Sequence, residues 1–193
     1  MTIKERLVID KVRSFRVAGD NGFPIGPPVF ITKWALNHLL ETIGNMPSES
    51  GGKLWGPKGQ EGIDVFEFDN SGSGESVFRP DSDWGNHRLA FWLRIEDSHI
   101  WVGDIHSHPT HWNGFLSKKA GFAKGDLGYI EAVFDYNPEM KRFFSPIITF
   151  DPDDVPVIWP WAVEREGLRV CYSPIKVVAG REYLPYKEAR HGI

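Results

Sequence analysis

The chain has 193 residues, of which 41% are hydrophobic and 25% charged, with a formal net charge of -4. This composition is typical of a globular protein, and the length fits a single domain, residues 1–193, with a full hydrophobic core. No Lys/Arg cluster and no apolar run of about 20 residues is present, which argues against a nucleic-acid partner and against a membrane span. The N-terminal stretch MTIKER lacks the apolar segment of a secretory signal. The single cysteine, Cys171, cannot form a disulfide within the chain, so we expect it to be a buried small side chain in a cytoplasmic protein.

The first half of the chain predicts one clear helix among strands. Apolar residues at helical spacing predict a helix over 32–43, with Thr32 as its N-cap. Strands are predicted on both sides of it, at residues 7–17, 48–57 and 63–68. Residues 70–85 are rich in Ser, Gly, Asp and Pro and predict a surface loop. Residues 88–95 fit either a strand or a helix.

The second half predicts a buried strand, a helix and then further strands. The apolar run 100–105 predicts the buried strand, and residues 110–125 show no periodicity. A helix is expected from Asp126, with its end at the Asn-Pro pair 137–138. Three more strands are predicted, at residues 143–150, 155–163 and 168–178. This order of elements indicates an α/β or α+β protein with a mixed β-sheet flanked by helices.

The stretch GDIHSHP, residues 103–109, is the most informative part of the sequence. A strand directs residues i and i+2 to the same face, so His106 and His108 can point their imidazoles at one place. Neutral imidazole is the commonest protein ligand of zinc, and a catalytic zinc site usually has three protein ligands and one open position. The sequence therefore predicts two ligands of a zinc site and requires a third.

The third ligand, the base and the oxyanion donor each have a leading candidate. Asp126, at the start of the helix that follows, could supply a carboxylate, although Asp also serves as an ordinary N-cap. Glu49, beside two glycines that allow close backbone approach, could act as the base, or it could be a surface residue in a turn. Ser117 could donate a hydrogen bond to a developing oxyanion, or it could be an ordinary loop serine.

Two further residues bear on the same site. Asp104 shares the face of His106 by strand alternation, so we expect it either to support the site, where it could hydrogen-bond an imidazole, or to be structural. His111 lies just beyond the histidine pair and is a third possible ligand. The remaining histidines are not assigned to the site, since their local sequence is helical, loop-like or terminal: His38, His87, His99 and His191.

Together, these residues resemble the JAMM (MPN-type) metallopeptidases, especially the small stand-alone bacterial members. That pattern is a Glu before a Gly-Gly strand, then His-x-His-Pro, seven residues, Ser, two residues and Asp. The stretch SESGGKLWG, residues 48–56, is similar to the Glu segment, and Ser117 follows seven spacer residues after Pro109. The resemblance covers residues 30–150 and implies a JAMM or cytidine-deaminase-like fold.

One position departs from the pattern. The Asp is expected three residues after Ser117, where this chain has Ala120. We align Asp126 with it instead, which implies a six-residue insertion between Ser117 and Asp126. An alternative alignment places Ala123 at the serine and removes the oxyanion donor.

The resemblance implies a Zn²⁺-dependent hydrolase that cuts an amide or isopeptide bond at the C-terminus of a ubiquitin-like protein. In that mechanism His106, His108 and Asp126 hold the metal, Glu49 transfers the proton and Ser117 steadies the oxyanion. An E1-like enzyme in the same system is an implied partner, and an extended substrate tail would lie along a sheet edge. Two alternatives remain: processing of a sulfur-carrier protein adduct, and a catalytically inactive MPN-type scaffold.

Overall fold

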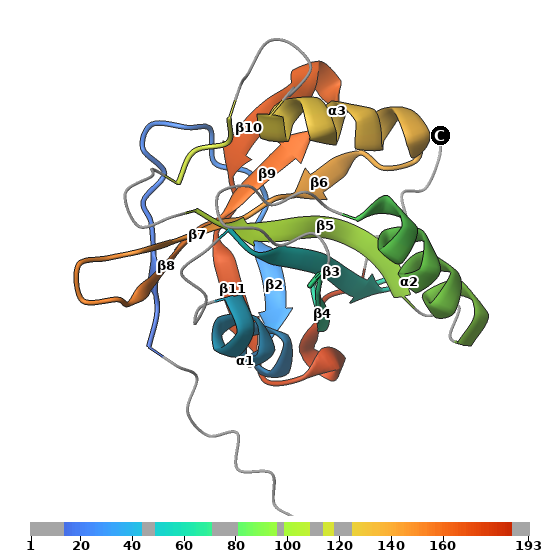
Figure 1. Ribbon diagram of the computed structural model, residues 1–193, viewed down its shortest axis with the longest axis horizontal. Coiled ribbons are helices and arrows are strands. Elements are labelled where there is room, and N and C mark those ends of the chain that lie inside the picture. Colours follow the sequence, from blue (N-terminus) through green and yellow to red (C-terminus); the bar gives the residue numbers. More distant parts are fainter. Residues whose placement is uncertain are drawn as a thin grey trace, which may run out of the picture.

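The computed structural model describes residues 14–43, 49–70, 81–95, 99–108, 114–117 and 125–186. In this part of the chain, three α-helices flank a mixed sheet of nine strands, which confirms the predicted fold class at that level (Figure 1). The helices are α1 (Lys33–Thr42), α2 (Ser82–Ile95) and α3 (Gly125–Tyr136). None of the helices in the described residues is both long and apolar enough to cross a membrane. Residues 7–13 of the predicted first strand lie outside the described residues.

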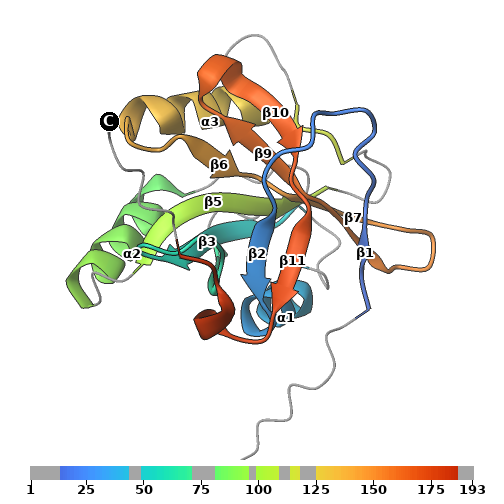
Figure 2. The same cartoon turned by 180° about the vertical axis from the view of Figure 1, so that it is seen from behind.

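The large sheet is built around β5 (His99–Ser107). On one side of β5, β3 (Gly51–Pro57) pairs antiparallel with it and carries β4 (Val65–Phe68) at the outer edge. On the other side, β5 pairs with both β6 and β7. From β7 the sheet continues through β8 to β1, and from β6 it continues through β9 to β10. Their bounds are β1 (Arg16–Val17), β6 (Arg142–Phe144), β7 (Ile147–Phe150), β8 (Pro156–Trp159), β9 (Trp161–Glu164) and β10 (Arg169–Tyr172). Figure 2 shows the separate parallel pair of β2 (Val29–Thr32) with β11 (Ile175–Val178).

The two faces of the sheet are covered by different helices. On one face, α1 packs in a core that includes Ile105 and Phe144, and its N-cap is Thr32, whose side chain accepts a hydrogen bond from the backbone N–H of Ala35, as predicted. On the other face, α3 packs in a second core around Phe143. Because neighbouring residues of a strand point to opposite faces, the burial of Ile105 against α1 directs His106 toward the side of α3.

The predicted loop 70–85 is wrong at its end, because residues 82–85 already belong to α2. Asp81 starts this helix: its Oδ1 accepts hydrogen bonds of 2.9 Å from the backbone N–H groups of Asp83 and Trp84. The ambiguous segment 88–95 continues the helix, and Arg88 pairs with Glu67 of β4. Capping by Asp81 therefore outweighed the loop-like composition of the segment.

Each of the three predicted C-terminal strands is divided in two, and each break contains a proline: Pro146, Pro160 and Pro174. Proline lacks a backbone N–H and cannot complete a strand ladder. The breaks change the partners of the chain. After Pro174, β11 leaves the large sheet to pair with β2, and the segments before and after Pro146 both pair with β5. The pairing of β7 with the end of β5 brings it beside the histidine pair.

Two glycines allow the central strands to come this close. A Cβ on Gly103 would lie 1.8 Å from the carbonyl oxygen of Phe144, and a Cβ on Gly52 would lie 2.1 Å from that of Glu67. Both distances are far below van der Waals contact, so the close packing of β6 on β5 and of β4 on β3 requires glycine at these positions.

Candidate metal centre

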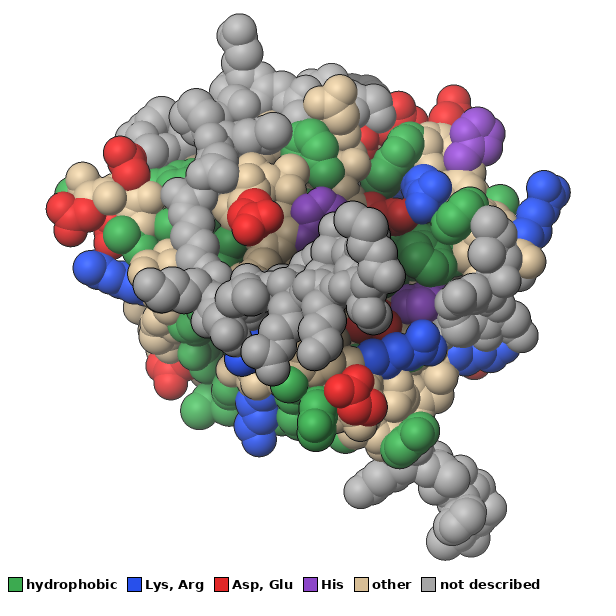
Figure 3. Space-filling model, turned by 90° about the horizontal axis from the view of Figure 1, so that it is seen from below, with side chains coloured by type: hydrophobic (Ala, Val, Ile, Leu, Met, Phe, Trp, Pro, Cys, Tyr) green, Lys and Arg blue, Asp and Glu red, His purple; other side chains and the backbone are tan. Residues whose placement is uncertain are grey.

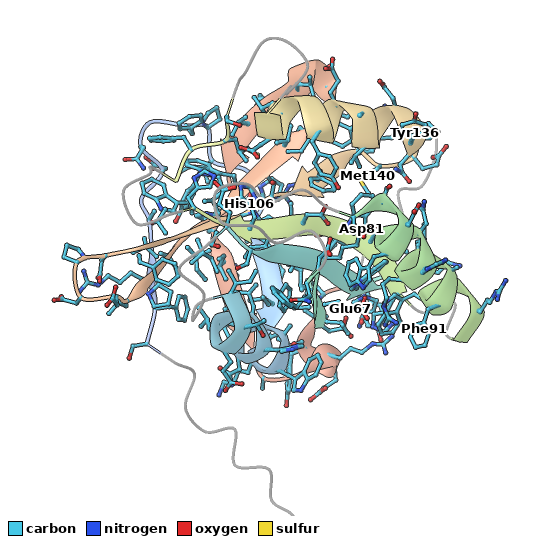
Figure 4. All side chains as sticks on the ribbon, in the orientation of Figure 1. Glu67, Asp81, Phe91, His106, Tyr136 and Met140 are labelled. Carbon is cyan, nitrogen blue, oxygen red and sulfur yellow. The ribbon has the colours of Figure 1, made fainter. Side chains whose placement is uncertain are left out.

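The two histidines of the motif lie at the end of β5 and are both buried. Their Nε2 atoms are 3.1 Å apart. The backbone N–H of His108 donates to the carbonyl of Ile148 at 2.8 Å, so β7 fixes the position of this end of the strand. Figure 4 shows His106 near the end of β5 from which the β7–β8 hairpin extends. The strand and its neighbour therefore hold two imidazole nitrogens at one point on the α3 side of the sheet.

Asp126 completes a group of three ligand atoms. It lies in the first turn of α3, and its Oδ1 is 3.6 Å from Nε2 of His106. Its other carboxylate oxygen accepts a 2.7 Å hydrogen bond from the backbone N–H of Ser117, whose hydroxyl accepts a 3.1 Å bond from the backbone N–H of Asp126. The carboxylate thus turns toward the histidines and Ser117, and the hydroxyl of Ser117 satisfies an N–H group at the start of α3 in the way a cap does.

The chemistry of this group fits a divalent cation. One ligand atom from each of His106, His108 and Asp126 lies within 4.8 Å of the other two, so the cluster could hold a metal ion. Two imidazoles and one carboxylate are a donor set that zinc accepts. Burial lowers the pKa of His106 to about 4, although the Asp126 carboxylate raises it and His108 lowers it further by smaller amounts. The imidazole of His106 is therefore neutral at pH 7, which is the form that binds a metal.

Glu49 lies just before β3, close in sequence to the residues that pair with the histidine end of β5. Gly51 lies opposite His106, and the backbone N–H of Ser107 donates to the carbonyl of Ser50 at 2.8 Å. Glu49 comes directly before Ser50, whose own backbone N–H donates to Ser107 Oγ at 3.1 Å. Glu49 is only 6% exposed, so it is not the surface residue in a turn that the sequence left as an alternative.

Ser117 belongs to a short segment that packs on aromatic residues. The Trp161 indole donates a hydrogen bond to the carbonyl of Gly114, and the Phe115 ring stacks on that of Trp161 at 5.9 Å. This packing fixes residues 114–117 beside the start of α3. A hydroxyl that accepts one hydrogen bond can still donate its own proton, so the contact with Asp126 leaves Ser117 able to donate.

The expected partner of Asp104 is wrong. Asp104 shares the face of His106, but it bonds other residues: the Tyr129 hydroxyl donates to it at 2.6 Å, the Trp101 indole at 2.8 Å and the Lys53 ammonium at 3.4 Å. Burial raises the pKa of Asp104, against the opposing effect of Lys53 and of these hydrogen bonds. Tyr129 is not among the predicted site residues, although its place three residues after Asp126 puts it on the same side of the predicted helix.

The other predictions have mixed outcomes. Cys171 is buried as expected. His38 and His87 are exposed, but His99 is wrongly placed in a loop: it begins β5 and is buried with its Nε2 3.1 Å from Asp64 Oδ2. The remaining candidates lie outside the described residues: His111, Ala120, Ala123 and His191.

We expect acid to destabilise the metal-free protein through His106. The folded chain resists protonation of this imidazole down to a pKa of about 4, whereas the unfolded chain takes up the proton near the ordinary value of 6.5. Below pH 6.5 the unfolded state therefore binds more protons, and the free energy of unfolding should fall toward pH 4 by up to roughly 3 kcal/mol from this residue. Urea unfolding of the protein, after a chelator has removed any metal, measures the change between pH 7 and pH 4.5. In the His106→Gln variant, the free energy of unfolding should fall less between these two pH values. An equal fall in both proteins would contradict the role given to His106.

Comparisons with known proteins bear on the fold. No protein-family model matches the sequence, and no curated protein matches it. Among solved structures, the chain is similar to the solution structure of protein DSY2949 from Desulfitobacterium hafniense, with a TM-score of 0.53 and 16% sequence identity. That match covers 80% of this chain and 96% of the other. At this identity the likeness concerns the fold alone.

Proposed function

We propose that this protein is a JAMM-type zinc metallopeptidase, with a JAMM or cytidine-deaminase-like fold, that cuts an amide or isopeptide bond at the C-terminus of a ubiquitin-like protein. The observation that carries the proposal is the convergence of His106, His108 and Asp126, whose ligand atoms lie within 4.8 Å of one another. Ser117 exchanges hydrogen bonds with Asp126, and Glu49 lies just before β3, the strand that pairs with β5. The proposal places the reaction in the cytoplasm, which the single buried cysteine favours.

The metal would be held by the two imidazoles and the carboxylate. When bound, zinc lowers the pKa of water and polarises a carbonyl group. His106 is suited to this role because burial keeps it neutral, and Asp126 because its second oxygen is oriented by the backbone N–H of Ser117. An aspartate that is hydrogen-bonded on one oxygen and free to turn the other toward the metal is typical of such ligands.

The proton transfer belongs to Glu49 and the charge stabilisation to Ser117. Glu49, buried just before β3, would take a proton from the attacking water with its carboxylate and pass it to the leaving amine. Ser117 can donate its hydroxyl proton to the negative charge that develops on the scissile carbonyl oxygen.

The substrate class rests on the resemblance of the motif. Figure 3 shows acidic, basic and apolar side chains interspersed among the described residues that are visible on this face. An extended C-terminal tail is the part of a ubiquitin-like protein that could reach a site at the end of β5. An E1-like enzyme would supply the conjugates that this reaction consumes.

The experiment is a cleavage assay with three substrates of one ubiquitin-like protein: a peptide-bond fusion at its C-terminal glycine, a lysine isopeptide, and a sulfur-carrier form with a C-terminal cysteine adduct. We expect cleavage directly after the tail, loss of cleavage with a chelator and recovery with added zinc. Preference for the cysteine adduct would select sulfur-carrier processing. A protein that holds one zinc ion per chain and cleaves none of the three would contradict the proposed activity and favour the scaffold.

A further inference from the structure

A hydrogen bond joins α3 to β5, the two elements that carry the candidate ligands. The Tyr129 hydroxyl of α3 donates a 2.6 Å hydrogen bond to Oδ2 of Asp104 on β5. Asp126 also approaches His106 between the same two elements. The two contacts lie side by side, because Asp104 precedes His106 by two residues on the strand and Tyr129 follows Asp126 by three residues on the helix.

This spacing makes the Tyr129–Asp104 bond a neighbour of the metal centre. Residues two apart on a strand point to the same face about 7 Å from each other, and residues three apart on a helix are about 5–6 Å apart on its surface. The hydrogen bond therefore spans the same gap between strand and helix that a metal ion bound by His106 and Asp126 would span. A change in its length would change the distance between these two ligands.

Asp104 is the fixed end of this bond. Its Oδ1 accepts hydrogen bonds from the Trp101 indole at 2.8 Å and from the Lys53 ammonium at 3.4 Å. Lys53 is itself confined, since its ammonium lies 4.1 Å from the centre of the Trp101 ring. On its other side it meets α2, where a Cβ on Gly85 would come within 2.7 Å of its Cε. Because the sheet and α2 hold Asp104 in place, the hydrogen bond adjusts the position of α3.

We propose that Tyr129 is a positioning residue for the metal centre: by bonding Asp104 it sets the distance from α3 to β5 and so places the Asp126 carboxylate against the two histidines. This inference rests on the metal site of the proposed function. It adds a residue outside the motif, and it gives the hydrogen-bonded group of Asp104, Lys53, Trp101 and Tyr129 a role in metal binding.

Two variants separate positioning from stability. Tyr129→Phe removes the bond and keeps the ring, so zinc affinity should fall by about tenfold or more, as is typical when a group behind a metal ligand is lost. Asp104→Asn can keep a bond to Tyr129, with its amide N–H donating to the phenol oxygen, but it removes the charge partner of buried Lys53. We expect it to be less stable than Tyr129→Phe and yet to bind zinc close to the wild-type affinity.

The measurements are zinc affinity by chelator competition, melting temperature, and the visible spectrum of the Co²⁺-substituted protein, which reports ligand geometry. The control is Thr32→Ala, which removes the cap of α1 on the opposite face of the sheet and should lower the melting temperature without altering the spectrum. An altered spectrum for Tyr129→Phe alone supports the proposal. A wild-type spectrum for Tyr129→Phe, or zinc affinities that follow stability across all three variants, overturns it. Wild-type protein that binds neither ion instead overturns the metal site itself.

Discussion

Replacement of Glu49 by glutamine should reduce turnover at least a hundredfold, because a positioned general base typically contributes about 10²–10⁴-fold. Glutamine has the shape of glutamate but cannot take up a proton. Glu49 is outside the three-ligand group, so zinc content and melting temperature should stay at their wild-type values. The measurement is the cleavage rate of the preferred substrate with zinc content determined on the same sample.

The matched control is Glu139→Gln, the same chemical change at an exposed position beyond α3. It should leave turnover unchanged. Retained turnover in Glu49→Gln would remove Glu49 from the mechanism, whereas loss of zinc in that variant would make it a ligand and leave the base to be found elsewhere. The pairing of lost activity with full zinc content is therefore the informative result.

Replacement of His108 by alanine should empty the metal site and abolish activity. It removes one of three protein ligands, a larger loss than the roughly 10–100-fold weakening seen when a group behind a ligand is changed. The fold should survive, because the bond from His108 to Ile148 uses the backbone N–H, which alanine keeps. Elemental analysis of protein purified without chelator, together with circular dichroism, measures both expectations.

His38→Ala is the control for this variant, since His38 is an exposed histidine on α1, on the opposite face of the sheet. It should retain the zinc of the wild type. Full zinc content in His108→Ala would show that the histidine pair does not form the ligand set, and the hydrolase proposal would lose its central observation.

The sequence predicted the parts of the site that depend on short-range pattern. Strand alternation was enough to place His106 and His108 together, and helical spacing was enough to place Asp126 at the start of α3. The sequence could not predict contacts between distant segments. Nothing in the local sequence shows that Tyr129 and Lys53 converge on Asp104, because that depends on how α3 and β3 lie over β5.

The fold shows the same division. Hydrophobic patterns located the C-terminal strands, but the breaks at Pro146, Pro160 and Pro174 determine their partners. Read as continuous apolar runs, these segments predicted three strands of a single sheet. The missing N–H of each proline instead redirects the chain, and the choice of new partner for β11 depends on β2, which lies more than a hundred residues earlier.

The reciprocal hydrogen bonds between Ser117 and Asp126 bear on how such sites tolerate changes in chain length. These bonds fix Ser117 and Asp126 relative to each other, so residues can be added between the two without shifting either functional group. The entropic penalty of a longer loop rises only with the logarithm of its length. Insertions in this stretch would therefore cost little free energy. A motif search that requires a fixed Ser–Asp spacing would miss every sequence that carries such an insertion.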